Sequence, residues 1–211
     1  MSVLQYLASR ADCAPTIPVI ALDELAAAVP LARACAAGGV RILEITLRTA
    51  AGVQAIEAIA GQVPDVLVGA GTVTRVEELK RVQDAGARFA FAPGFDPRVV
   101  EEAAKLGLEF IPAVMTPSEV MLAQNLGVGL MKLFPAAQAG GPGMLKALAG
   151  PFPSARFCPT GGVDAANAAT YLALPNVVAV GGSWMTPKDL VARGDWAGIT
   201  ALAAEALKLR R

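Results

Sequence analysis

Short apolar runs rich in β-branched and aromatic residues recur along the chain, and a longer segment follows each of them. Successive runs begin 20 to 26 residues apart, a spacing that fits one strand, one loop and one helix. The runs are IPVIAL from Ile17, ILEITL from Ile42, VLVGAG from Val66, FAFAPG from Phe89, FIPAVM from Phe110, LMKLFP from Leu130, RFCPTGG from Arg156 and VVAVGG from Val177. The pattern predicts eight repeated strand–helix units.

The segments between the runs carry signals for helix starts and stops. Thr74–Glu77 and Thr116–Glu119 fit capping boxes, and Asp96 fits an N-cap before Pro97. Helix ends are expected at Gly86, Gly107 and Gly127. Eight such units predict an α/β fold, a (βα)8 TIM barrel that occupies residues 1–211 as a single domain. An open doubly wound sheet is the alternative, but GAG at Gly69 lacks the third glycine of a dinucleotide motif.

Composition narrows the class of protein. Of the 211 residues, 55% are hydrophobic and 17% are charged, which argues against disorder. The 18 basic and 18 acidic residues balance and form no basic run, so nucleic-acid binding is not expected. No apolar stretch reaches the length of a membrane span and no signal peptide is evident, so we expect a cytoplasmic protein without membrane association. Cys13, Cys35 and Cys158 are expected to be reduced thiols.

The chain contains no histidine. A Ser-His-Asp or Cys-His nucleophile system is therefore excluded, and so is a zinc site with imidazole ligands. Proton transfer must use carboxylates, lysine, tyrosine or water.

A lysine interrupts the apolar run LMKLFP. Alternation in a strand places Leu130, Lys132 and Phe134 on one face and Met131 and Leu133 on the other. Burial disfavours the ammonium form, and a neutral amine is able to attack a ketone and form an imine. The alternative is a lysine at a strand end whose ammonium group reaches water.

The run ILEITLRT places Glu44, Thr46 and Arg48 on one face if the strand continues to Arg48. A carboxylate in an apolar strand needs a partner or a chemical role. Glu44 is either a general acid/base beside an amine or a structural ion-pair partner of Arg48 or Lys132. Arg48 is placed to bind an anionic group of a substrate.

Glycine-rich sequences end three of the predicted strands. GAGT ends the third, and Thr72 there has a hydroxyl that can donate to a carboxylate. PTGG (159–162) and GGS (181–183) end the seventh and eighth strands, where barrels often bind phosphate. Glycine exposes backbone N–H groups to an anion, and the two glycine pairs together favour a phosphate site more than either pair alone. For GAGT the alternative is an ordinary tight turn between strand and helix.

The runs ILEITLRT, VGAGTVT, APGF, MKLFPA, GPFPSARFCPTGGV and GGSWMTP resemble the 2-keto-3-deoxy-6-phosphogluconate (KDPG) aldolase family, which includes enzymes that also cleave 4-hydroxy-2-oxoglutarate (KHG). The resemblance implies that Lys132 forms a Schiff base and that Glu44 is the general acid/base, working through a water. It implies substrate-binding roles for Arg48, Thr72, Pro93, Phe134, Thr160, Gly161, Gly162, Gly182 and Ser183. It also implies a homotrimer without metal or other cofactor, whose partner is a small phosphorylated 2-keto acid.

The implied reaction is cleavage of KDPG to pyruvate and glyceraldehyde 3-phosphate, and also of KHG to pyruvate and glyoxylate. Ala113 and Ala137 depart from the family pattern, which often has glycine and an acidic residue there, and the first strand lacks an arginine found in some members. The alternatives are an aldolase for the galactonate epimer, a metal-dependent aldolase, and a non-catalytic barrel that binds sugar phosphates.

Overall fold

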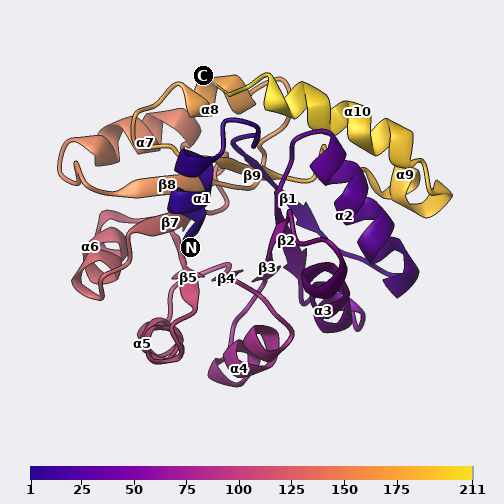
Figure 1. Cartoon of the computed structure of the whole chain (residues 1–211). Coiled ribbons are helices and arrows are strands. Elements are labelled where there is room, and N and C mark those ends of the chain that lie inside the picture. The colour runs from indigo at the N-terminus through magenta and orange to yellow at the C-terminus, as the bar shows by residue number, and fades with distance from the viewer. Residues whose placement is uncertain (211) are drawn as a thin grey trace.

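The computed structural model describes residues 1–210 as a mixed α/β fold in which helices surround parallel strands (Figure 1). The strands are β1 Thr16–Ile20, β2 Ile42–Thr46, β3 Leu67–Gly71, β4 Phe89–Phe91, β5 Glu109–Ile111, β6 Ala113–Val114, β7 Leu130–Leu133, β8 Arg156–Pro159 and β9 Val180–Gly182. The helices are α1 Val3–Ser9, α2 Ala28–Ala37, α3 Gly52–Gln62, α4 Val76–Asp84, α5 Pro97–Leu106, α6 Pro117–Asn125, α7 Gly141–Ala149, α8 Ala168–Leu172, α9 Lys188–Arg193 and α10 Trp196–Leu207, with a 3-10 turn, η1, at Leu25–Ala27.

The strands form two parallel sheets. One has the order β5-β4-β3-β2-β1-β9 and curves into a half-barrel, and the other has the order β6-β7-β8. The fifth apolar run was expected to form one strand, but it forms both β5 and β6. Pro112 divides them because it has no backbone N–H to donate to a neighbouring strand. The eighth run is also shorter than expected, since its strand begins only at Val180.

Side-chain alternation along β7 follows the prediction. Leu130 belongs to an apolar cluster inside the sheets, which includes Phe89 and Phe91. Met131 and Leu133 belong to a different cluster, formed with residues of α6, α7 and α8. The two faces of this strand therefore meet different surroundings, and Lys132 shares the face of Leu130.

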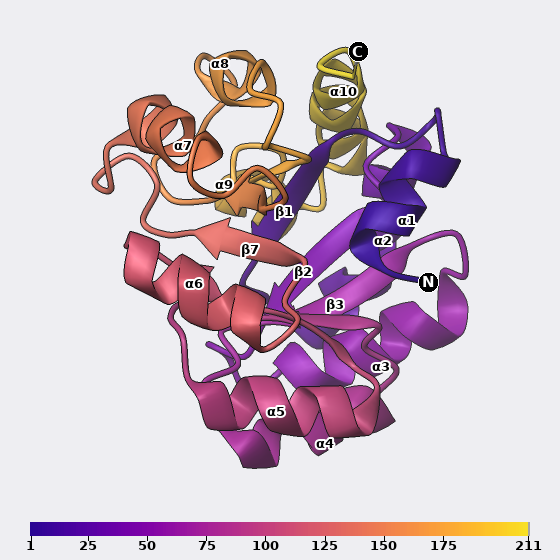
Figure 2. The same ribbon diagram turned by 90° about the vertical axis from the view of Figure 1, so that its left-hand side faces the viewer.

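The helix α1 lies at the amino-terminal ends of the strands (Figure 2). Val3 is fully buried there, and its backbone N–H donates to Glu109 Oε2 at 2.7 Å. The Tyr6 hydroxyl donates to the carbonyl of Asp65 at 2.8 Å, and Arg210 donates to the carbonyl of Leu7 at 3.0 Å. This end is therefore held by direct polar contacts.

Most of the predicted helix boundaries are confirmed. Asp96 caps α5, and Thr116 and Glu119 form the reciprocal capping box of α6. The predicted box Thr74–Glu77 is wrong by one residue, because Glu78 is the carboxylate that accepts the backbone N–H groups of Thr74 and Arg75. The three expected stop glycines have positive φ angles, at Gly86, Gly107 and Gly127.

All three cysteines are free and buried, as expected for reduced thiols. Within residues 1–210, every helix is too short or too polar to span a bilayer.

Candidate active site

Lys132 is the buried cation of β7. Its exposed fraction is 5%, and it pairs in register with Ala113 of β6 and Cys158 of β8. Its Nζ atom lies 5.3 Å from the ring centroid of Phe91 and 5.0 Å from that of Phe134. The amine therefore lies close to two aromatic rings and is almost completely withdrawn from water, which disfavours an ammonium group.

Glu44 of β2 faces this amine. Its Oε1 atom lies 3.5 Å from Lys132 Nζ, and the Glu44 side chain is 1% exposed. Burial raises the pKa of Glu44, and the positive charge of Lys132 opposes this shift. A raised carboxyl pKa favours a proton on Glu44, so the carboxyl group beside the amine is suited to donate and accept a proton near neutral pH.

Small residues make the room that this pair occupies. Gly71 pairs with Thr46 in the β2–β3 ladder, and a Cβ atom at Gly71 would collide with Glu44 Oε1. Gly181 is related in the same way to Thr160, whose hydroxyl occupies the space of a Cβ atom. The glycines of GAGT and GGS thus accommodate polar side chains of neighbouring strands as well as ending their own.

Thr72 follows β3 with a φ of +62°, a left-handed conformation that is costly for a β-branched residue. Arg48 lies in the turn after β2. The condition for a shared face with Glu44 and Thr46 is not met, since β2 ends at Thr46. The Nε of Arg48 donates to Thr46 Oγ1 at 3.2 Å, which orients the guanidinium group.

The two glycine-rich ends meet between β8 and β9, where Thr160 forms a parallel bridge with Gly181. Thr160 is 5% exposed, whereas Ser183 is exposed. Gly161 and Gly162 adopt φ angles of +93° and +75°, which side chains rarely adopt. The glycine pair following β8 and the Gly182-Ser183 pair therefore lie at neighbouring strand ends.

The two departures from the family pattern lie beside these groups. Ala113 pairs with Lys132 in the β6–β7 ladder. The backbone N–H of Ala137 donates to the carbonyl of Gly161 at 3.0 Å, and a Cβ atom at Gly162 would collide with the Ala137 side chain. Pro93 is exposed in the segment that follows β4.

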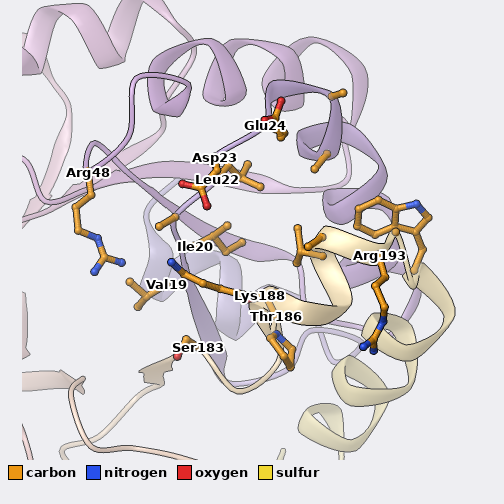
Figure 3. A pocket seen from close by; sticks show the side chains of 18 residues that line it. Val19, Ile20, Leu22, Asp23, Glu24, Arg48, Ser183, Thr186, Lys188 and Arg193 are labelled. Atoms are coloured by element: carbon orange, nitrogen blue, oxygen red, sulfur yellow. The ribbon is translucent and has the colours of Figure 1, made fainter.

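A cavity of about 690 Å³ opens beside the site, between the ends of β1 and β9 and the helix α9 (Figure 3). Arg48 and Ser183 line it, and Lys132 and Glu44 do not. Asp23 and Lys188 also line it. Sequence reasoning missed both, because they lie in segments that carried no motif of their own.

Cys158 is the remaining reactive side chain near the amine. It is 1% exposed, and burial raises the pKa of its thiol to about 12. A thiol that remains protonated is a poor nucleophile, so Cys158 packs here as a small apolar residue.

Comparisons with known proteins agree on one family. The sequence model of the family described as KDPG and KHG aldolase matches residues 7–202. The 2-dehydro-3-deoxy-phosphogluconate aldolase of Dickeya dadantii is 49% identical over 92% of this chain and 91% of its own length. The KHG/KDPG aldolase of Escherichia coli K12 is 48% identical over 92% of this chain and 91% of its own.

A solved structure of a family member has the same fold as this chain. The KDPG aldolase of Legionella pneumophila, captured with pyruvate as a covalent carbinolamine, superposes with a TM-score of 0.90 at 42% identity. That comparison covers 96% of this chain and 97% of the other. This chain belongs to the KDPG and KHG aldolase family.

Proposed function

We propose that the protein is a class I aldolase that cleaves KDPG to pyruvate and glyceraldehyde 3-phosphate, and also cleaves KHG to pyruvate and glyoxylate. The observation that carries the proposal is the buried amine of Lys132, which lies 3.5 Å from the carboxyl group of Glu44. Its family relatives are aldolases, and one of them was captured with pyruvate bound covalently.

The reaction begins when the neutral amine of Lys132 adds to the C2 ketone of the substrate. Loss of water gives a cationic imine, which accepts electrons from the bond that will break. Glu44, through a water, removes the proton of the C4 hydroxyl, and the C3–C4 bond breaks to release glyceraldehyde 3-phosphate. The Glu44–water pair then protonates the enamine at C3, and hydrolysis of the imine frees pyruvate.

The raised pKa of Glu44 suits this cycle, because one group must both give and take a proton. In the free enzyme the raised pKa favours a proton on Glu44, which can then be donated during formation of the imine. Once the imine is formed, its fixed positive charge favours the carboxylate, which is then the base. A structural ion pair is the competing role for these residues, and it predicts no chemistry at Lys132.

The other site residues bind the two ends of the substrate. Arg48 and Thr72 hold the carboxylate, and Thr160 lies near the substrate hydroxyl. Pro93 and Phe134 form walls of the pocket. The phosphate is bound by Gly161, Gly162, Gly182 and Ser183, whose backbone and hydroxyl donors suit an anion. The meeting of β8 and β9 at the Thr160–Gly181 bridge supports this assignment.

The strands form one closed (βα)8 barrel in a single domain. The carbonyl of Pro112 accepts the backbone N–H of Lys132 at 2.9 Å, and bridges at Phe157–Val177 and Thr160–Gly181 link β8 to the last strand segment. These contacts support closure between the two sheets. A single cooperative unfolding transition is expected in calorimetry, and two separate transitions would contradict the single domain.

We further expect a cytoplasmic homotrimer. Met115, Met121 and Leu122 are exposed hydrophobic residues in and just before α6, with exposed fractions of 44%, 55% and 49%, and they support an interface between copies. Sedimentation equilibrium tests the trimer.

Borohydride trapping tests the Schiff base. Incubation with pyruvate and borohydride should add the mass of the reduced adduct to Lys132, as peptide mass spectrometry would show, while the exposed Lys146 stays unlabelled. An unlabelled Lys132 would remove the proposal.

Activity that survives a strong chelator excludes the metal-dependent aldolase. Comparing kcat/KM for KDPG and its galactonate epimer identifies the preferred substrate.

A further inference from the structure

The cavity beside the site contains two cationic side chains that have no ion-pair partner within residues 1–210, Arg48 and Lys188. A third cation on its wall, Arg193, pairs with Asp189 at 3.3 Å. Arg48 makes one side-chain hydrogen bond, to Thr46, and Lys188 makes none within the same residues. Of the three cations that line this cavity, Lys188 is thus the one without a hydrogen-bond or ion-pair partner within residues 1–210.

The segment between Ser183, the last residue of GGS, and Lys188 is held in place by packing. The segment between them is anchored by Met185 and Thr186, which are 0% and 7% exposed. The backbone N–H of Thr186 donates to the carbonyl of Ser183 at 3.1 Å, which closes a turn. Lys188 begins α9 directly after this turn, so its position relative to Ser183 is set by packing.

The side chain of Lys188 extends across the cavity toward Arg48, and Ser183 lies at the adjoining wall (Figure 3). The carboxylate of Asp23 also faces this space, whereas Glu24 lies farther along the wall. Among the ion pairs of the described residues, none joins Lys188 to Asp23. An anion bound near Ser183 would therefore meet the amine from one side and a competing carboxylate from another.

The proposed phosphate ligands are backbone N–H groups and one hydroxyl, all of them neutral. A phosphate group carries close to two negative charges at neutral pH, and a charge-assisted contact is stronger than a neutral one. Arg48 is assigned to the carboxylate at the other end of the substrate. Of the proposed phosphate ligands, Ser183 lines the same cavity as Lys188, and Lys188 has no ion-pair partner within residues 1–210.

We propose that Lys188 binds the phosphate group and so determines the preference for phosphorylated over unphosphorylated 2-keto acids. This inference rests on the proposed aldolase function. Lys188 does not take part in bond cleavage, and its contribution is to the binding and electrostatic attraction of the doubly charged group. Asp23 weakens that attraction, so the two residues have opposite effects on one substrate.

The test compares the two substrates in the full-length enzyme. Lys188→Gln should raise the KM for KDPG about five- to tenfold, with kcat within twofold, and should leave kcat/KM for KHG within twofold. Lys188→Arg should restore the KM for KDPG. Arg193→Gln removes the same charge from the same cavity and should leave both substrates unchanged. The KM of the wild type for KDPG should rise with salt more steeply than that of Lys188→Gln.

Asp23→Asn removes a negative charge from the cavity, whereas Lys188→Gln removes a positive one. Asp23→Asn should lower the KM for KDPG about twofold and leave KHG unaffected. Lys188→Gln with an unchanged KM for KDPG, or with equal losses on both substrates, overturns the inference. Borohydride trapping of pyruvate on Lys132 needs no phosphate. Trapping in Lys188→Gln with no change in substrate preference would remove only the role of Lys188, whereas no trapping in the wild type would remove the aldolase function itself.

Discussion

Two carboxylates of similar chemistry occupy opposite parts of the strands. Glu44 lies within β2 beside Lys132, and Glu109 begins β5 at the end that α1 covers (Figure 2). Burial raises the pKa of both groups. Glu109 accepts a backbone N–H at 2.7 Å, whereas the nearest donor to Glu44 lies at 3.5 Å, the limit of a hydrogen bond. The structural carboxylate is satisfied by the backbone, and the candidate catalytic one faces a second titratable group.

Lys132→Ala is expected to have the largest effect on the site that contains Glu44. Removing the amine removes the covalent step, so kcat for KDPG should fall by about 10⁴-fold or more. The assay is pyruvate release, with circular dichroism to show that the fold is retained. Lys146→Ala removes an exposed lysine of α7 and should leave kcat unchanged. Substantial turnover by Lys132→Ala would contradict the Schiff-base mechanism.

Glu44→Gln should have the second largest effect. The amide keeps the shape of the side chain but cannot transfer the proton, so kcat should fall about 10²- to 10⁴-fold. Glu109→Gln is the matched control at the other end of the strands, and we expect its kcat to equal that of the wild type. Equal losses in the two variants would show that the carboxylate beside Lys132 is no more than structural.

The pairing of Lys132 with Glu44 was open to prediction because it follows from two regular features. Alternation along a strand decides which side chains point inward, and repeated parallel units bring the inward residues of different strands together. The free cysteines and the cap at Asp96 were predicted for similarly local reasons.

Other features depend on packing that the sequence pattern does not contain. Pro112 divides a run that looks continuous, while its carbonyl still accepts the N–H of Lys132. The left-handed backbone of Thr72 has no local signal, since threonine seldom adopts it. The cavity that contains Lys188 forms between segments that are far apart in the sequence, residues 19–48 and 183–196, so no single sequence motif predicts it.

Thr72→Gly is expected to change stability and activity in opposite directions. Glycine adopts a φ of +62° without penalty, so the free energy of unfolding should rise by about 1 kcal/mol in urea titrations. Loss of the hydroxyl should lower kcat/KM for KDPG about tenfold. Thr74→Gly, two residues further on, relieves no positive φ and should not stabilise the protein. A stabilised Thr72→Gly variant with full activity would remove Thr72 from the site.

The smallest effect is expected at Glu109, in the pH dependence of stability. Burial raises the pKa of Glu109 in the folded protein, although the bonded N–H of Val3 and the N-terminal charge oppose the shift. The folded state then binds more protons than the unfolded state, so the contribution of Glu109 is fully present below the ordinary pKa of a glutamate. It is lost as the pH rises through the pKa of the folded state.

Glu109→Gln removes this titration and keeps an oxygen that accepts from Val3. At pH 8 the variant should therefore be more stable than the wild type, by about 0.5 kcal/mol, and below pH 4 the two should agree. Urea unfolding at a series of pH values measures the difference. If the wild type instead gained stability over the variant with rising pH, the ionised carboxylate would be the favoured partner of the Val3 N–H. Glu109 would then stabilise this end of the strands by charge, and the contrast with Glu44 would rest on geometry alone.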